Sequence, residues 1–172
     1  MRVAVTGTPG TGKTTATTLL ESDREVVHLN DVIEAEELYT EVDEERDSVV
    51  ADFEALSSWL EGREDVVVES HLAHHLEADR VAVLRCDPAD LEERLRGRGE
   101  SETKARENAE SEALDVILAE AVERHGLESV YEIDTTDREP DAVANALEAV
   151  IRGEREPSAG EVDFLAYLDE DR

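Results

Sequence analysis

The sequence predicts a three-layer α/β fold in which helices cover both faces of a five-stranded parallel sheet. Two patterns carry this prediction. Short apolar, β-branched runs alternate along the chain with segments whose apolar residues recur at helical spacing, which is typical of strand–helix–strand units. One run, residues 65–69, contains three consecutive valines, as parallel strands buried on both faces commonly do. Ligands of such folds bind at the carboxyl ends of the strands.

Each strand is predicted where a short apolar run is bounded by polar or turn-forming residues. These runs are residues 2–6, 25–29, 65–69, 80–85 and 129–133. A first helix follows the loop after residue 6, and further helices are expected at about 30–38, 53–60, 88–97, 103–125 and 140–152. Asp87 before Pro88 is a helix cap with a first-turn proline, and Gly126 ends the longest helix.

The length of 172 residues suits one domain, which we expect to span residues 1–152. Residues 153–172 form a separate tail, in which a linker containing Pro157, Ser158 and Gly160 precedes several apolar residues. This tail is expected either to dock on the domain or to bind a partner, and docking is the simpler expectation.

The chain is strongly acidic, with 46 Asp and Glu residues against 17 Lys and Arg residues and a formal net charge of −29. Molar salt shortens the Debye length to roughly 3 Å and screens the resulting self-repulsion. Lysine occurs only at positions 13 and 104. Acid excess with scarce lysine predicts a protein of a salt-accumulating halophile, most simply an archaeon, and disfavours binding to free nucleic acid.

Composition also argues against several other classes of protein. A hydrophobic content of 40% disfavours an acidic disordered chain. The single cysteine, Cys86, cannot form an internal disulfide and is expected to be a small buried hydrophobe. No apolar run approaches the roughly 20 residues that span a bilayer, and the first residues lack the layout of a signal peptide. We therefore expect a cytoplasmic protein without a membrane partner.

The segment at residues 7–14, Gly-Thr-Pro-Gly-Thr-Gly-Lys-Thr, matches the phosphate-binding P-loop pattern G-x-x-x-x-G-K-[ST] between a predicted strand and a predicted helix. Its glycines let successive backbone N–H groups face phosphate oxygens. Lys13 is expected to bridge the β- and γ-phosphates of ATP, and the Thr14 hydroxyl is expected to bind Mg²⁺. The loop residues expected to contact the nucleotide are Gly7, Gly10, Thr11, Gly12, Lys13 and Thr14.

An acidic residue, Glu69, stands at the end of the valine strand, where P-loop proteins commonly hold magnesium or its bound water. Glu69 would lie near Thr14 if the two strands are neighbours, and His71 follows on the same face if the strand continues. His74 and His75 come soon after. Because adjacent side chains diverge on a helix or strand, we expect these two histidines at the surface or in packing rather than as metal ligands.

A basic cluster lies at residues 94–106 of this acidic chain and consists of Arg94, Arg96, Arg98, Lys104 and Arg106. Phosphoryl transfer needs cations around the γ-phosphate, and arginine supplies planar, bidentate donors. Gly97 and Gly99 could serve as hinges of a lid that closes over ATP. The arginines also suit the negative end of a helix dipole. We expect both roles, with Arg94 and Arg98 as catalytic residues in the lid.

Together these features resemble the adenylate kinase isoenzyme 6 family over about residues 1–152. The shared features are the P-loop extended to Thr15, the acid-x-His at residues 69–71, the strand end at 83–87 and the short arginine lid followed by Lys104 and Asn108. The resemblance implies a P-loop nucleoside-monophosphate-kinase fold and reversible phosphoryl transfer between ATP and AMP. It also implies slow ATPase activity and a role in maturation of the small ribosomal subunit, with a small-subunit ribosomal protein as a partner.

By position, the resemblance implies that Gly10, Gly12, Lys13, Thr14 and Thr15 bind the ATP phosphates. It places Arg98 in a lid at about residues 97–108, facing ATP, and a monophosphate-binding segment at about 30–50. The acid of this family is usually Asp, so Glu69 is one methylene longer; with His71 it is the expected catalytic pair, and it would hold Mg²⁺ partly through water.

The monophosphate-binding segment departs from the family pattern. Glu34 stands where an arginine that grips the AMP phosphate is expected, and the nearby arginine is Arg46. Two alternatives to an adenylate kinase therefore stay open. One is a nucleotide-gated ATPase of ribosome assembly with little AMP kinase activity, and the other is a kinase of another small acceptor, such as a different nucleoside monophosphate or shikimate.

Overall fold

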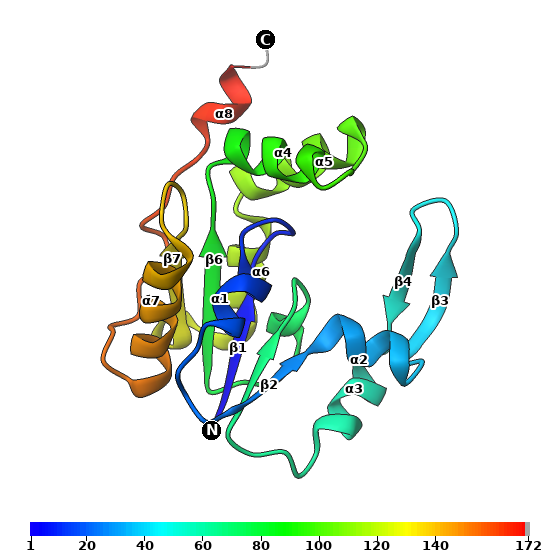
Figure 1. Cartoon of the computed structure of the whole chain (residues 1–172), viewed down its shortest axis with the longest axis vertical. Coiled ribbons are helices and arrows are strands. Elements are labelled where there is room, and N and C mark those ends of the chain that lie inside the picture. The colour runs from blue at the N-terminus through cyan, green and yellow to red at the C-terminus, as the bar shows by residue number, and fades with distance from the viewer. Residues whose placement is uncertain (171–172) are drawn as a thin grey trace.

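The computed structural model describes residues 1–170, and its central sheet has five strands that pair in parallel in the order β2-β5-β1-β6-β7 (Figure 1). The strands are β1 (Arg2–Thr6), β2 (Glu25–His28), β5 (Val66–Glu69), β6 (Arg80–Arg85) and β7 (Val130–Asp134). The predicted α/β fold with a five-stranded parallel sheet is therefore confirmed. Each strand begins and ends within one residue of its expected position.

The valine run of β5 is apolar throughout because both faces of the sheet are buried. Val66 and Val68 pack into a cluster on one face, whereas Val67 packs into a separate cluster on the other. The same alternation holds in β1, where Ala4 belongs to the first cluster and Val5 to the second. A strand between two layers of helices has no polar face, so its sequence shows no polar alternation.

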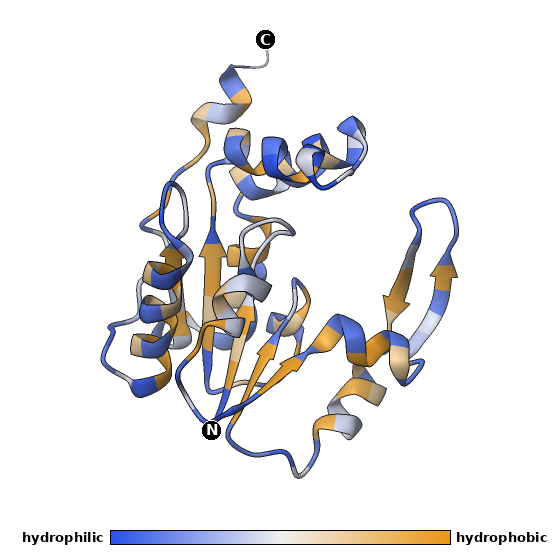
Figure 2. Cartoon of the chain, viewed as in Figure 1, coloured by the Kyte–Doolittle hydropathy of each residue, from blue (hydrophilic) through white to orange (hydrophobic). Residues whose placement is uncertain are grey.

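The helices form the two outer layers. α1 (Lys13–Thr18) and α7 (Pro140–Arg152) supply apolar residues to the cluster that contains Val67. α2 (Leu29–Ala35), α3 (Phe53–Leu60) and α6 (Val116–His125) supply apolar residues to the cluster on the opposite face. Figure 2 shows the apolar strands between helices that carry hydrophilic outer residues. This arrangement is the predicted three-layer architecture.

The helix predicted at residues 30–38 is shorter, and a hairpin that the sequence analysis did not predict follows it. α2 ends at Ala35, after which Glu37 adopts a left-handed conformation with a φ of 53°. The chain then forms β3 (Tyr39–Asp43) and β4 (Ser48–Ala51), which pair antiparallel and stand away from the main sheet (Figure 1). The acidic, exposed residues of this segment hide the alternation that usually marks a strand.

The single helix predicted at residues 103–125 is wrong. The structure has α5 (Glu102–Ala113) and α6, which are separated at Asp115, a residue with a φ of 56°. The Asp115 carboxylate accepts a hydrogen bond of 2.5 Å from the buried Arg85 guanidinium. This long-range contact accompanies a helix break that helical periodicity did not reveal. The predicted stop at Gly126 is present, with a φ of 84°.

At the carboxyl ends of the strands, α4 (Pro88–Gly97) and α5 pack against each other beyond β6 (Figure 1). The Asp87 cap accepts hydrogen bonds from the backbone of Ala89 and Asp90, and the buried Cys86 packs beneath the pair with Leu91 and Leu95.

The tail from residue 153 contacts the domain at several points as far as Tyr167. Its Ser158 backbone donates to the Val130 carbonyl, and Tyr167 of α8 (Ala166–Asp169) donates to the Glu92 carboxylate at 2.7 Å. Residues 171–172 of the predicted tail lie outside the described residues. Across residues 1–170, no helix has both the length and the apolar composition that crossing a bilayer requires.

Candidate active site

The glycine-rich loop connects β1, at the centre of the sheet, to α1, and two of its glycines are required by close contacts. Gly7 has a φ of 145°, and a Cβ there would lie 2.5 Å from the Leu84 carbonyl oxygen. Gly10 has a φ of 92°, and a Cβ there would lie 2.9 Å from Leu91 of α4. Larger residues would therefore push the loop away from β6 and from α4.

Lys13 is buried at the base of the loop, and its ammonium donates to the carbonyl oxygens of Gly7 and Thr8 at 2.8 and 3.1 Å. Burial lowers its pKa to about 8, although the carboxylates of Glu69 and Glu112 partly oppose the shift. A cation in this desolvated position is well suited to an anionic ligand, because a bound phosphate would replace the lost hydration.

Thr14 and Glu69 lie together, as expected if their strands are neighbours. β1 and β5 pair with Val5 opposite Glu69, and the Thr14 hydroxyl lies 3.4 Å from one Glu69 carboxylate oxygen. The other Glu69 oxygen lies 2.8 Å from Nδ1 of His28. The sequence analysis missed His28, although its place at the end of a strand neighbouring β5 could have indicated it. A hydroxyl and a carboxylate are oxygen donors of the kind that Mg²⁺ prefers, so the residues present fit this ion.

His71 lies beyond the end of β5 and lines two neighbouring cavities with Asn30. Burial, followed by the positive charge of Lys13, lowers its pKa to about 4. The imidazole is therefore neutral at neutral pH and can accept or donate a hydrogen bond without adding positive charge.

Part of the basic cluster at residues 94–106, here called the basic segment, lies beside the loop. Arg94 of α4 donates to the Gly10 carbonyl at 3.4 Å, and Arg98, the residue that caps the end of α4, lines two cavities at the loop. Lys104 is further along, in α5, where it forms an exposed ion pair with Glu100. The structure thus brings Arg94 and Arg98 to the loop and pairs Lys104 with a carboxylate of its own segment.

Three adjoining cavities pass through this region, and shared residues connect them. The first, about 370 Å³, lies between the loop, α4 and α7, and Thr11, Gly12, Thr15 and Arg98 are among its lining residues. The second, about 230 Å³, is bounded by residues that include Lys13, Thr14, Glu69, His71 and Arg98. The third, about 200 Å³, lies between α2 and the β3–β4 hairpin. A cavity of about 640 Å³ lies at the amino-terminal end of β1 and has none of these residues.

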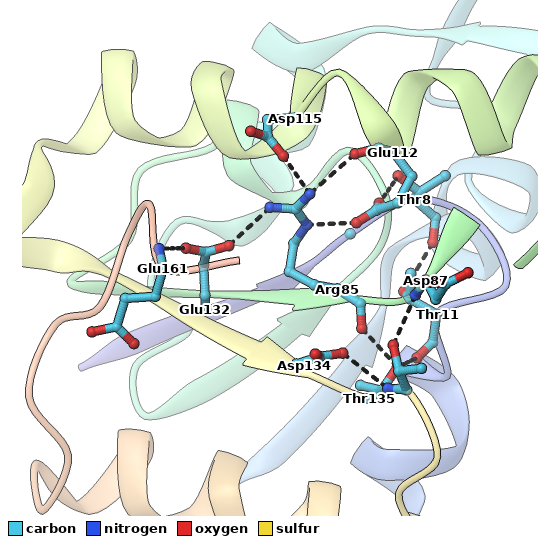
Figure 3. Close-up of polar contacts among 12 residues, drawn as sticks. Thr8, Thr11, Arg85, Asp87, Glu112, Asp115, Glu132, Asp134, Thr135 and Glu161 are labelled. Carbon is cyan, nitrogen blue, oxygen red and sulfur yellow. Dashed lines mark hydrogen bonds and ion pairs between the residues drawn. The ribbon is translucent and has the colours of Figure 1, made fainter. Parts of the chain in front are cut away.

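A buried ionic network anchors the loop, and the sequence analysis missed it (Figure 3). The Thr8 hydroxyl donates to Glu112 at 2.5 Å, and Glu112 accepts from the Arg85 guanidinium. Arg85 also binds Glu132 of β7 at 2.8 Å, and Glu132 accepts from the backbone of tail residue Glu161. These residues lie in separate parts of the sequence. Burial is what identifies them, and it cannot be seen in the sequence alone.

A second link fixes the other side of the loop. The buried Thr135 hydroxyl, just after β7, lies 3.0 Å from the Thr11 carbonyl oxygen and 2.8 Å from the Arg85 carbonyl oxygen. Because Thr8 and Thr11 are each held by hydrogen bonds to buried groups of other elements, the loop is positioned before any ligand binds.

His74 and His75 depart from the expected divergence. They lie in the 3₁₀ helix η1 (Ala73–His75), where their ring centroids are 4.3 Å apart with an interplanar angle of 36°. Both rings turn toward the same carboxylate, Glu120 of α6. His74 is nevertheless buried, as expected for a packing residue.

Comparisons with known proteins agree with this geometry. The family described as "AAA domain" matches residues 3–115. Three archaeal proteins with the name "Putative adenylate kinase" are similar to this chain. The protein from Natronomonas pharaonis is 62% identical over 168 residues, 98% of this chain and 100% of the relative. The protein from Halobacterium salinarum is 60% identical over 169 residues, 98% and 100% of the two chains. The protein from Methanosarcina acetivorans is 48% identical over 163 residues, 88% and 86%.

Proposed function

Because this chain belongs to the archaeal adenylate kinase family and carries its P-loop AAA domain, we propose that it transfers a phosphoryl group from ATP to AMP. The observation that carries the proposal is the row of three cavities. The middle cavity contains Lys13 and Arg98 and shares lining residues with a cavity on each side. A donor nucleotide on one side and an acceptor on the other would meet at these two cations.

The donor site lies at the loop and α4. ATP would place its nucleoside in the cavity that Thr11, Gly12 and Thr15 line, and its phosphates would extend past Gly10 to Lys13. Each phosphate oxygen needs a donor in place of water, and the loop backbone and the lysine ammonium supply such donors. We place Gly7 in the same site because it lets the backbone turn beneath Leu84.

Catalysis would come from alignment and charge balance rather than from a covalent intermediate. Lys13, Arg94 and Arg98 would stabilise the negative charge of the transferring group. Thr14 would hold Mg²⁺ directly and Glu69 partly through water, and the bound ion supplies further charge neutralisation. The neutral imidazole of His71 lines both the middle cavity and the acceptor cavity, where it would orient the acceptor by hydrogen bonding.

Closure of the basic segment would exclude water from the transferring group. We assign the lid to about residues 97–108 of a domain spanning 1–152, with Gly99 as a hinge because its φ of 92° lies in the region that favours glycine. The monophosphate-binding segment is assigned to about 30–50, which includes α2 and the hairpin that line the third cavity. We propose that the protein acts in the cytoplasm.

A second function is favoured by the charge of the third cavity. Its lining includes the carboxylates of Glu34 and Asp47, and no arginine of residues 1–170 lines it. Arg46 belongs to the hairpin turn, where its backbone donates to Asp43. Two acids oppose a phosphate dianion, which favours an ATPase with little AMP kinase activity or a kinase of a less anionic acceptor. For the ATPase, the resemblance to the adenylate kinase isoenzyme 6 family implies a role in maturation of the small ribosomal subunit, with a small-subunit ribosomal protein as partner.

One assay separates these functions. ADP formation from ATP and Mg²⁺ is measured in molar KCl with and without AMP, and then with a panel of other acceptors. An adenylate kinase forms ADP much faster when AMP is present. Equal rates with and without AMP would contradict the first proposal and support the ATPase. Copurification of a small-subunit ribosomal protein that ATP weakens would support the assembly role.

A variant tests the charge argument directly. Glu34→Arg places a guanidinium at the acceptor cavity and should lower KM for AMP, because it replaces a repulsive charge with a bidentate phosphate donor. Glu36→Arg is the matched control, since Glu36 is exposed at the end of α2, two residues later, and does not line the cavity. Unchanged KM in Glu34→Arg would show that this position does not face the acceptor.

A further inference from the structure

Between η1 and α6 lies a cluster of two imidazoles and one carboxylate that the proposed reaction does not use. Nε2 of His74 lies 2.7 Å from a carboxylate oxygen of Glu120, and Nε2 of His75 lies 3.6 Å from the same oxygen. One ligand atom from each residue lies within 4.8 Å of the other two. None of the three residues lines the cavities assigned to ATP and its acceptor.

A hydrogen bond on the side away from Glu120 orients the buried imidazole of His74. Nδ1 of His74 lies 2.8 Å from the hydroxyl oxygen of Thr6, a buried residue at the end of β1. If Nδ1 carries the proton and donates to Thr6, Nε2 presents its lone pair toward Glu120. Metal-ligating histidines in proteins usually donate their other ring N–H to an oxygen in this way, which fixes both tautomer and ring orientation.

The cluster is also open enough to admit an ion. His74 is 1% exposed, whereas the side chains of His75 and Glu120 are 27% and 43% exposed. His75 packs against the Phe53 ring, with centroids 4.9 Å apart, which limits its motion. One wall is therefore rigid, and the half-exposed Glu120 can adjust to the ion.

We propose that His74, His75 and Glu120 form a binding site for a divalent transition-metal ion such as Zn²⁺. Tetrahedral zinc with ligand bonds of about 2.1 Å separates its ligand atoms by roughly 3.4 Å, so the three residues need to move by no more than about 1.5 Å. Water would complete the coordination on the exposed side. Two imidazole nitrogens favour zinc over Mg²⁺ or Ca²⁺, which prefer oxygen ligands.

The bound ion would join α6 to two segments of the active site. Thr6 directly precedes Gly7 of the loop, and η1 directly follows the segment that carries His71. The ion would thus stabilise the framework of the site without contacting the nucleotide.

The test must separate this site from weak binding by the acidic surface. Chelator-stripped protein in molar KCl with millimolar Mg²⁺ is titrated with Zn²⁺ against a chromophoric chelator. Glu120→Gln and His75→Gln each remove one ligand from a partly exposed position. Glu123→Gln is the matched control, because Glu123 is exposed on the same helix and lies outside the cluster.

Wild type and Glu123→Gln should bind one Zn²⁺ per chain, and each ligand variant should bind at least about tenfold more weakly. Saturating Zn²⁺ should raise the melting temperature of wild type by about 5–10 °C at a hundredfold excess over Kd, and much less in Glu120→Gln. Co²⁺ should give the intense visible absorption of four-coordinate cobalt in wild type. Equal Zn²⁺ affinity in wild type and both ligand variants would overturn the proposal, as would a wild type that binds none.

Discussion

At the scale of single residues, Lys13 shows how a buried cation can be prepared for an anionic ligand. Its ammonium donates to two carbonyl oxygens of its own loop, which accept from two of its three N–H groups but do not neutralise its charge. The nearest carboxylates that influence it, Glu69 and Glu112, leave its pKa below the ordinary value. Phosphate oxygens would bring both hydrogen bonds and negative charge.

Lys13→Ala should reduce phosphoryl transfer and ATP hydrolysis by roughly 10²- to 10³-fold or more, because the charge that stabilises the transferring group is lost. The fold should remain, since removing a desolvated charge leaves no unpaired ion behind. Turnover is measured beside circular dichroism. Thr18→Ala, an exposed position on the same helix, is the control and should keep its activity. Near-normal turnover in a folded Lys13→Ala protein would contradict the nucleotide assignment.

ATP affinity should depend on pH through the same lysine. Bound phosphates favour the charged ammonium, so its pKa is higher in the complex than the value of about 8 in the free protein. The affinity for ATP is therefore highest below that pH and falls as the pH rises through it. Calorimetric Kd values between about pH 6 and 9.5 would show the change, with melting curves at each pH as the control for unfolding. A constant Kd across the range would show that Lys13 does not bind the phosphates.

At the scale of elements, the end of α4 places two arginines, Arg94 and Arg98, at the loop, but the arginines of this helix end have different environments. Arg98 lines both the donor cavity and the middle cavity. Arg96, two residues earlier, forms ion pairs with Glu92 and Glu102 away from these cavities. Variants of Arg98 and Arg96 can therefore distinguish the proposed catalytic role from a role at the helix end.

Arg98→Ala should lower kcat more than it raises KM for ATP, because the loop still holds the phosphates while lid closure no longer brings this charge to the reaction. Arg96→Ala should leave both constants nearly unchanged and cost at most about 1 kcal/mol of stability. Steady-state kinetics and melting temperatures are compared for the two variants. An Arg98→Ala protein that melts early but turns over normally would contradict the lid assignment.

The Arg85 network joins β6, β7, α5 and α6. The stability of the folded protein should therefore depend on the buried Arg85 guanidinium. The Arg85 side chain is 2% exposed and faces the buried Glu112 and Glu132. Arg85→Met leaves these carboxylates unpaired, at a cost of about 3–5 kcal/mol. That cost corresponds to a melting temperature lower by about 6–20 °C.

Asp115→Asn is the control for this network. Its side chain is 37% exposed, and asparagine also tolerates the left-handed backbone found there, so the cost should be at most about 1 kcal/mol. Thermal melts of both variants in the same molar KCl make the comparison. Equal melting temperatures for Arg85→Met and wild type would show that the network contributes little net stability.

At the scale of the whole molecule, the net charge of −29 makes stability depend on salt. The chain is similar to proteins from Natronomonas and Halobacterium. Repulsion among its acidic side chains acts mostly at the surface, where dissolved ions screen it. The melting temperature should rise steadily between about 0.1 and 3 M KCl. Sucrose at matched osmolality is the control for non-ionic effects. A flat or falling curve in KCl would contradict the halophile interpretation.

The sequence alone determined the sheet and the phosphate-binding loop. Parallel strands buried on both faces must be short apolar runs, so β1, β5 and β6 were readable from composition. The loop was readable because the backbone that cradles phosphate is built from consecutive residues, and Gly7 and Lys13 stand at fixed spacing within it. The strands and the loop could be recognised because each is built from consecutive residues.

Only the tertiary structure decided the features that depend on contacts between distant residues. Arg85 meets Glu112 and Glu132, and the two histidines of η1 meet Glu120 on another helix. In a chain with 46 acidic residues, no pattern distinguishes a buried carboxylate from a solvated one. Burial is the property that distinguishes them. Because it is set when strands and helices pack, the fold had to be known before these carboxylates could be recognised.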